Sequence, residues 1–267
     1  MKKKLSLLCI ALFPLFLTLG ALTIFASIGL EKGKSDHDQN TRSIYVVGDS
    51  TASNYSSNFA PRAGWGQVFG EMFDQKIVVK NHAASGRSSK SFIDEGRLTD
   101  VLNQIEKGDY LFIQFGHNDQ KNDDPSRYTE PSTTYKSYLK QYIDGAYAKD
   151  ALPVLVTSVE RRRFTDDGQA RDSLGDYPQA LRELGAELHV PVIDLTTKSK
   201  ALYQEVGPEE TKKVFLWLEA DEHENYPDGV QDNTHFQENG ARLIAKLVAH
   251  EIKELKLRYL HSHVIQE

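Results

Sequence analysis

Three side chains in the sequence are of types that cooperate in ester hydrolysis: Ser50, Asp232 and His235. A serine hydroxyl attacks a carbonyl carbon only when a base removes its proton, and an imidazole serves as that base when a third group fixes its tautomer. Ser50 stands two residues after Gly48, behind an apolar run, where a small residue lets a turn tighten. Asp232 precedes His235 by three residues, a spacing that places both side chains on one turn. The pattern predicts Ser50 as nucleophile, His235 as base and Asp232 as the group that orients it.

Acyl transfer also needs hydrogen-bond donors for the oxyanion that forms on the carbonyl oxygen. The candidate donors are the backbone N–H groups of Ser50 and Gly86 and the side-chain amide of Asn118. Gly86 suits a close approach of the backbone to a substrate because it has no side chain. The neighbours of Asn118, His117 and Asp119, are expected to shape the turn and to satisfy backbone groups.

These residues need a scaffold that brings them together, and the hydrophobic pattern predicts an α/β fold. Short apolar runs rich in β-branched residues alternate with segments of helical periodicity. Such alternation predicts a single domain over residues 44–256, in which helices cover both faces of a parallel sheet, a three-layer α/β/α arrangement. The predicted strands are 44–47, 77–79, 110–115, 153–156 and 190–195, and helical segments include 66–73, 98–106, 135–148, 177–188 and 241–255.

Polar, glycine-bearing clusters follow several of the predicted strands. An open parallel sheet binds its ligands at the carboxyl ends of its strands, so these clusters are expected to meet at one edge. They occupy residues 48–51, 81–88, 116–119 and 157–163, and residues 232–236 stand before the last helix.

Charge and cysteine content exclude several classes of protein. The chain carries a net charge of −6, and Lys2 to Lys4 are the only charged residues among the first 30. The remainder therefore has 29 Lys and Arg against 38 Asp and Glu, a net charge of −9, which argues against nucleic-acid binding. The single cysteine, Cys9, lies in the same leader, so residues 31–267 form no disulfide, thiolate metal site or cysteine nucleophile.

Residues 1–30 are predicted to be a secretory signal peptide or an N-terminal membrane anchor. Lys2–Lys4 precede an uncharged apolar run over residues 5–30, which is longer than the ~7–15 residues of an ordinary signal and long enough to span a bilayer. Cleavage and permanent anchoring both stay open, and either places the catalytic part outside the cytoplasm, secreted or on the outer face of the membrane. Residues 31–43 are predicted to be a polar linker, and residues 257–267 a frayed C-terminal tail.

Motifs at the expected strand ends resemble the signature blocks of the SGNH (GDSL) hydrolase family, and within it the chain most resembles rhamnogalacturonan acetylesterases. The resemblance runs from about residue 44 to 256 and implies a flavodoxin-like sheet of five parallel strands. It implies the same triad, an oxyanion hole of Ser50, Gly86 and Asn118, and neither a metal nor an organic cofactor. The motifs are Gly48-Asp49-Ser50-Thr51, Gly64-Trp65-Gly66, Ala84-Ser85-Gly86-Arg87-Ser88, Gln114-Phe115-Gly116-His117-Asn118-Asp119 and Asp232-Asn233-Thr234-His235-Phe236.

Rhamnogalacturonan is a polyanion, because alternate sugars bear carboxylates, and a protein at −9 repels it within roughly 10 Å at moderate salt. Binding then needs a local positive site, for which the candidates are Arg87, Arg161, Arg162 and Arg163. Trp65 is a candidate to stack on a sugar ring, with packing beside the sheet as the alternative.

The expected function is an exported serine esterase that removes acetyl groups from a pectin-type polysaccharide. One alternative is a lipolytic esterase or lysophospholipase on the same fold, which needs an apolar acyl channel. A second alternative is a tethered polysaccharide-binding protein without catalysis, against which the intact Ser50, Asp232 and His235 argue.

Overall fold

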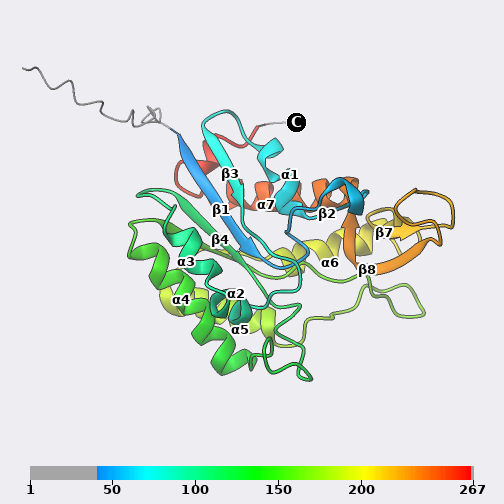
Figure 1. Ribbon diagram of the computed structural model, residues 1–267, viewed down its shortest axis with the longest axis horizontal. Helices are drawn as coiled ribbons and strands as arrows, with labels where there is room; N and C mark the ends of the chain where they lie inside the picture. The colour runs from blue at the N-terminus through cyan, green and yellow to red at the C-terminus, as the bar shows by residue number, and fades with distance from the viewer. Residues whose placement is uncertain (1–40, 266–267) are drawn as a thin grey trace, which may run out of the picture. The chain divides into compact units, whose positions relative to one another are not determined.

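A computed structural model describes residues 41–265 of the chain. Its main sheet has five parallel strands in the order β3-β1-β4-β5-β6 (Figure 1). The first of these strands lies between the second and the third along the chain, which is the flavodoxin-like order. The prediction of a five-stranded parallel sheet is therefore confirmed. The bounds are β1 Arg42–Gly48, β3 Ile77–Asn81, β4 Tyr110–Gln114, β5 Leu152–Val156 and β6 Val192–Ile193.

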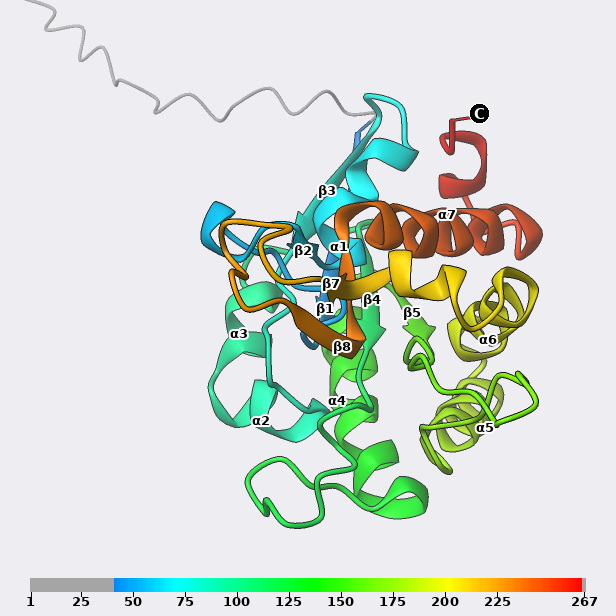
Figure 2. The same ribbon diagram turned by 90° about the vertical axis from the view of Figure 1, so that its right-hand side faces the viewer.

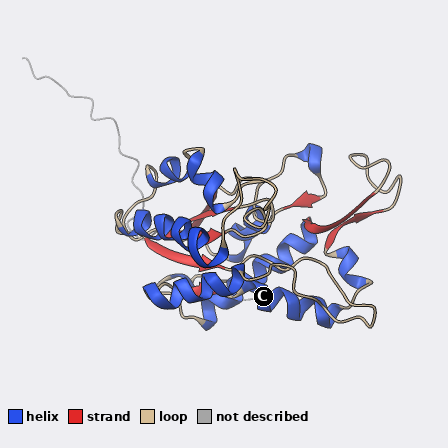
Figure 3. Ribbon diagram, turned by 90° about the horizontal axis from the view of Figure 1, so that it is seen from below, coloured by secondary structure: helices blue, strands red, loops and turns tan. Residues whose placement is uncertain are grey.

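Helices cover both faces of this sheet, as the view in Figure 3 shows. Successive side chains of β1 point to opposite faces, so Tyr45 and Val47 pack under α2, α3, α4 and α5. Ile44 and Val46 pack on the other face, under α1, α6 and α7. The helices are α1 Trp65–Val68, α2 Ser89–Asp94, α3 Arg97–Leu102, α4 Lys136–Tyr147, α5 Tyr177–Leu188, α6 Leu195–Val206 and α7 Glu238–Glu254.

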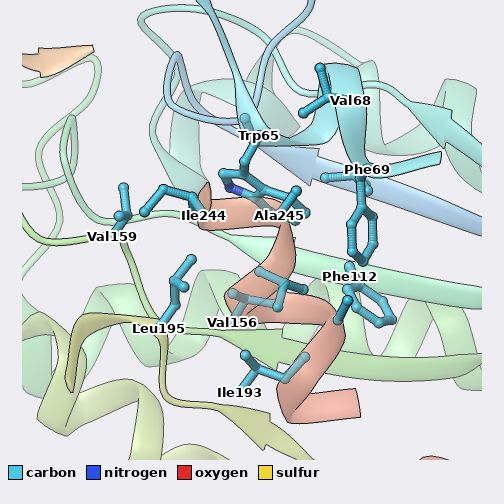
Figure 4. Packing of buried hydrophobic residues seen from close by; sticks show 14 of the residues in the cluster. Trp65, Val68, Phe69, Phe112, Val156, Val159, Ile193, Leu195, Ile244 and Ala245 are labelled. Atoms are coloured by element: carbon cyan, nitrogen blue, oxygen red, sulfur yellow. The ribbon is translucent and has the colours of Figure 1, made fainter. Parts of the chain in front are cut away.

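The helix α7 supplies much of the core on its face of the sheet. Ile244 and Ala245 of this helix are fully buried, and Figure 4 shows them beside side chains from the strands. The apolar stripe predicted between Ala241 and Leu255 is therefore the face that α7 buries, although Leu255 itself is exposed. Since α7 begins directly after β8 Val230–Gln237, this packing also anchors the strand that precedes it.

A second, three-stranded antiparallel sheet was not expected from the sequence. It has the order β2-β8-β7, with β2 Arg62–Ala63, β8 Val230–Gln237 and β7 Phe215–Leu218. Figure 2 shows the hairpin of β7 and β8 at the end of the main sheet where the parallel strands finish. Most residues of β8 are polar, so the sequence lacks the apolar alternation that signals a strand.

Residues 257–265 of the predicted C-terminal tail are packed, and the expectation that this part frays was wrong. Leu257 and Leu260 are buried in the core, and Val264 pairs with Phe73 in an isolated bridge. The first strand, β1, starts at Arg42, two residues before the predicted start of the domain. Among residues 41–265 no helix is long and apolar enough to cross a membrane. The predicted signal or anchor, residues 1–30, lies outside the described residues.

Candidate active site

The structure brings Ser50, His235 and Asp232 together in a hydrogen-bonded chain. Ser50 Oγ lies 2.8 Å from His235 Nε2, and His235 Nδ1 lies 2.6 Å from Asp232 Oδ2. Ser50 occupies the turn after β1, and Gly48 is needed there because a Cβ at that residue would stand 2.8 Å from the Gln114 carbonyl oxygen. The three groups have the order nucleophile, base and orienting carboxylate that acyl transfer requires.

A bulge in β8 presents the base and its partner. Phe236 and Gln231 of β8 pair with Phe215 and Trp217 of β7, so the four residues 232–235 lie opposite Leu216 alone. In a β-bulge, side chains no longer alternate between the two faces of the sheet and can point in new directions. Sequence spacing predicted that Asp232 and His235 share a turn, and the bulge is that turn.

The bulge is held by its own carboxylate and by two neighbouring segments. Asp232 Oδ1 accepts the backbone N–H groups of Thr234 and His235 at 2.7 and 3.0 Å. Asn233 Oδ1 accepts from Arg162 Nη1 at 3.1 Å and from Trp217 Nε1 at 3.0 Å. The Arg162 backbone N–H also donates to the Asn233 carbonyl oxygen. Arg162 and Trp217 therefore brace the segment that carries the base.

The Asp232 carboxylate is kept ionised by this arrangement. Burial alone would raise its pKa, but the hydrogen bond and charge of His235 and the two backbone N–H groups lower it to about 2. An ionised Asp232 accepts the Nδ1 proton of His235, which leaves Nε2 free to take the proton of Ser50.

Two backbone donors at the site are open to a ligand. Within residues 41–265 neither the Ser50 N–H nor the Gly86 N–H has a hydrogen-bond acceptor. Gly86 has φ +80°, a left-handed conformation that favours glycine, and a Cβ there would meet nothing within 4 Å. Asn118 Nδ2 donates one hydrogen to the Arg87 carbonyl oxygen at 3.0 Å, and its second hydrogen is left for an oxyanion.

Trp65 lies in the core, so its predicted role as a sugar-stacking residue was wrong. Its side chain is fully buried and packs edge-on against Phe69 (Figure 4). Trp65 Nε1 donates to Gln114 Oε1 at 2.6 Å, and Gln114 Nε2 donates to Thr51 Oγ1 at 2.9 Å. Trp65 thus stabilises the turn after β1 through its hydrogen bond to Gln114.

Asp119 is a fully buried carboxyl group beside the site. Burial raises its pKa to about 7, against the opposing effect of hydrogen bonds from Ser89 and Thr129. Asp119 Oδ1 lies 2.5 Å from Ser89 Oγ and 2.9 Å from Thr129 Oγ1. The interpretation of this residue as a turn-shaping group agrees with these contacts.

Tyr55 and Arg62 contact the nucleophile segment and were not singled out from the sequence. Tyr55 Oη donates to the Ser50 carbonyl oxygen at 2.7 Å, and Arg62 Nη2 donates to Tyr55 Oη at 2.9 Å. The Arg62 guanidinium also lies over the Tyr55 ring, 4.4 Å from its centroid. No motif marks Tyr55, and only its position five residues after Ser50 hints at a contact.

The loop between β7 and β8 docks on the loop that follows the nucleophile. Asn225 Nδ2 donates to the carbonyl oxygens of Ser57 and Ala60 at 2.8 and 2.9 Å. Tyr226 Oη donates to the Phe59 carbonyl oxygen at 3.1 Å. Two segments more than 160 residues apart therefore form one wall beside Ser50.

The four candidate arginines do not form one patch. Arg87 pairs with Glu95 at 3.0 Å, and Arg161 Nη1 bonds to Gln120 Oε1 and to the Ser173 carbonyl oxygen. Arg162 is engaged in the bulge and lies 4.7 Å from the Trp217 ring centroid. Arg163 is exposed, and within the described part of the chain its side chain makes no hydrogen bond or ion pair.

The sequence predicted neither a metal ion nor an organic cofactor, and the structure does not test this prediction. No group of three or more His, Asp or Glu side chains among residues 41–265 is arranged to hold a metal ion. The triad and its donors supply a base, a nucleophile and oxyanion contacts from the chain itself. The prediction of no cofactor remains a prediction.

The chain belongs to the GDSL-like lipase/acylhydrolase family, which it matches over residues 46–243. The fold and the triad are thus those of a carboxylic ester hydrolase. The chain is 51% identical to rhamnogalacturonan acetylesterase RhgT of Bacillus subtilis, over 83% of this chain and 94% of that protein. It is 45% identical to the probable rhamnogalacturonan acetylesterase YesY of the same organism, over 84% and 98%. The solved structure of Bacillus subtilis protein YxiM matches with a TM-score of 0.69 and 29% identity, over 81% of this chain and 57% of that chain.

Proposed function

We propose that this chain is a serine esterase that removes O-acetyl groups from rhamnogalacturonan, an acetylated pectic polysaccharide. The observation that carries the reaction type is the chain of contacts from Ser50 Oγ through His235 to Asp232. Beside it stand two backbone N–H groups that have no acceptor in the part of the chain that the structure describes. The support for the substrate is the 51% identity to a rhamnogalacturonan acetylesterase over most of both chains.

In the first half of the reaction, Ser50 becomes acetylated. His235 Nε2 takes the hydroxyl proton of Ser50 while Oγ bonds to the acetyl carbonyl carbon. The N–H groups of Ser50 and Gly86 and the Asn118 amide then donate to the oxyanion. The bond from this carbon to the sugar oxygen breaks, and His235 gives its proton to that oxygen, so a free sugar hydroxyl leaves.

In the second half, water removes the acetyl group. His235 Nε2 takes a proton from the water, and the water oxygen bonds to the carbonyl carbon of acetyl-Ser50. The same three donors hold the second oxyanion. The bond to Ser50 Oγ breaks, Oγ regains a proton from His235, and acetic acid leaves and loses its remaining proton to the solvent as acetate.

A lipolytic esterase needs an apolar channel for the acyl chain beside its nucleophile. The structure has an apolar pocket, but this pocket does not lie at the triad. That pocket is lined by residues of α6, α7, the Phe69–Met72 turn and the C-terminal segment, and none of them belongs to the site. The side chains that bond to Ser50, those of Tyr55 and His235, are polar. A non-catalytic binding role does not explain why the triad is assembled with hydrogen-bonding distances.

Substrate comparison tests the proposal. Acetate release is measured with acetylated rhamnogalacturonan, acetylated xylan and a phospholipid at equal ester concentrations. We expect the highest kcat/KM on rhamnogalacturonan. A higher kcat/KM on either of the other two substrates would contradict the proposed substrate, and no release from any of them would contradict the reaction.

We propose that Arg163 binds a uronate carboxylate of the polysaccharide. Among residues 41–265 its guanidinium makes no hydrogen bond or ion pair, and Arg162 next to it contacts Asn233 in the bulge of the triad. Arg163→Ala should raise KM on the polysaccharide about two- to fivefold, which is the scale of an exposed ion pair. Lys107→Ala, which also removes one exposed positive charge, is the matched control. Equal KM values in the two variants would contradict the assignment.

We also propose that residues 1–30 direct the catalytic part across the cytoplasmic membrane. The support is the order of three lysines followed by an uncharged apolar run. Fractionation of cells that make the full chain, with the mass of the recovered protein, tests this. Export with a shortened chain indicates cleavage, export of the intact chain in the membrane fraction indicates an anchor, and recovery in the cytoplasm alone contradicts the proposal.

A further inference from the structure

A buried hydrogen bond joins the residues that precede two functional groups. Asp49 stands directly before the nucleophile Ser50, and His117 directly before the oxyanion donor Asn118. His117 Nδ1 lies 3.0 Å from Asp49 Oδ2. Asp49 is fully buried and His117 is 5% exposed, so the bond is shielded from water.

This bond lies beyond the last paired residues of the two strands. β1 and β4 pair in register up to Gly48 and Gln114, and then each chain turns away. The turn after β4 needs Gly116 at φ +154°, where a Cβ would stand 2.5 Å from Ser158 Oγ. Past the end of the ladder, the contact between Asp49 and His117 joins the two turns.

The other oxygen of Asp49 holds the nucleophile turn itself. Asp49 Oδ1 accepts from the Thr51 backbone N–H at 2.9 Å and from Thr51 Oγ1 at 2.8 Å. One carboxylate therefore contacts the turn of Ser50 through one oxygen and the turn of Asn118 through the other.

The contacts of Asp49 also indicate which nitrogen of the His117 ring carries a proton. Burial by itself raises the pKa of Asp49, but the charge and hydrogen bond of His117 and the bonds from Thr51 bring it below its ordinary value. An ionised carboxylate only accepts, so His117 Nδ1 carries the proton. His117 Nε2 is buried and has no partner among the described residues, which makes Nδ1 the contact through which the ring acts.

We propose that His117 is a positioning residue that sets the distance between the nucleophile and the oxyanion amide through its bond to Asp49. The inference rests on the proposed ester hydrolysis at Ser50. The transition state needs Ser50 Oγ and the Asn118 amide on two atoms of the same carbonyl group, so an error in their separation raises the barrier. Ground-state binding of a small ester does not depend on that separation.

The same two strands carry a matched buried bond at their opposite ends. Asp109 Oδ1 accepts the Ser43 backbone N–H at 2.8 Å, and Asp109 Oδ2 accepts the Glu106 backbone N–H at 3.0 Å. Asp109 is 7% exposed and also ties β1 to the chain around β4. It lies at the amino ends of the strands, away from the triad, and so provides a structural control.

The test compares three variants in the full chain. His117→Leu fills similar space and removes the donor, His117→Asn keeps a donor close to the position of Nδ1, and Asp109→Asn weakens the control bond. Steady-state kcat and KM are measured on a small acetate ester, with Tm and with titration of active sites so that only folded protein is counted. We expect His117→Leu to lose about 10- to 100-fold in kcat at native KM, and His117→Asn to recover most of it. Asp109→Asn should lower Tm and keep its kcat.

The outcomes separate this inference from the proposed function. A native enzyme that releases no acetate from any ester contradicts the ester hydrolysis itself. An active native enzyme with native kcat in His117→Leu overturns the positioning role. So does a His117→Asn variant as slow as His117→Leu, because the donor would then be irrelevant. A kcat that falls with Tm equally in Asp109→Asn and His117→Leu shows a structural role only and also overturns it.

Discussion

Buried carboxylates form similar hydrogen bonds at the amino ends and at the carboxyl ends of strands β1 and β4, but the two sets of bonds have different roles. At the amino ends, Asp109 accepts backbone N–H groups from Ser43 and Glu106, and the buried Leu257 and Leu260 cover the core close by. At the carboxyl ends, Asp49 accepts from His117 and Thr51, and the donors Ser50 and Asn118 stand one residue further on. A buried carboxylate serves stability at one end and the geometry of the site at the other.

This difference follows from what each end has to bury. At the amino ends, the C-terminal segment packs into the core. The buried polar groups there only need hydrogen-bond partners. The carboxyl ends keep two N–H groups without acceptors in the described part of the chain, so these donors are available to an oxyanion. Variants at the carboxyl end should therefore change kcat, and variants at the amino end should change stability.

The largest effect is expected for Asp232→Asn. The amide no longer fixes the tautomer of His235, and kcat should fall about 10⁴-fold while the fold is retained. Steady-state kinetics on a small acetate ester and Tm measure both quantities. A loss of less than about tenfold would mean that the contact of 2.6 Å between Asp232 and His235 is not used in the reaction.

A smaller loss is expected for Asn118→Ala. It removes one oxyanion donor and should lower kcat about 100- to 1,000-fold at similar KM. The measurement is the same, with binding of a non-hydrolysed ether analogue as the control for ground-state affinity. If KM rose and kcat stayed native, Asn118 would be a binding group and not an oxyanion donor.

The amino end is probed by Leu260→Ala. Leu260 is fully buried, so truncation should cost about 2–5 kcal/mol in the free energy of unfolding. Urea denaturation measures this cost, and kcat at a temperature where the variant is folded should match the native value. A large drop in kcat would break the division between the two ends. Leu255→Ala, at an exposed residue just after α7, should cost far less.

The last effect concerns the pH dependence of stability and involves no change in kcat. The pKa of Asp119 is raised from 3.8 to about 7 in the fold, so the unfolded chain releases this proton first. The contribution of Asp119 to the free energy of unfolding should therefore fall as pH rises from about 4 to about 7, and be constant above that. Asp119→Asn should flatten this part of the profile in urea denaturation. An unchanged profile would contradict the raised pKa.

The sequence was most informative where one pattern had one physical cause. Tyr45 and Val47 alternate with Ile44 and Val46 because β1 is buried on both faces, so the run was recognisable as a central strand. The triad was recognisable because Ser50 follows that strand and because Asp232 and His235 are close in sequence. Gly48 indicated a tight turn and Gly86 a close approach of the backbone to a substrate, and the structure adds that Gly86 has a left-handed conformation.

The errors arose where tertiary contacts overrode local character. The strand β8 consists mostly of polar residues, and its pairing depends on Phe215 and Trp217 of β7. For Trp65 the sequence left both sugar stacking and packing open, and the structure shows packing in the core. The role of Arg162 depends on Asn233, a partner 71 residues away that no spacing rule predicts. Tyr55 is only five residues from Ser50, but no motif marks the contact between its side chain and the Ser50 carbonyl oxygen.

Covalent labelling tests the central claim most directly. The protein is incubated with an organophosphonate that reacts with activated serines, digested, and analysed by mass spectrometry, with His235→Ala as the control. The account predicts that the native protein carries one label, on the peptide that contains Ser50, and that the control reacts far more slowly. A label on another residue, or acetate release that persists in Ser50→Ala, would contradict it.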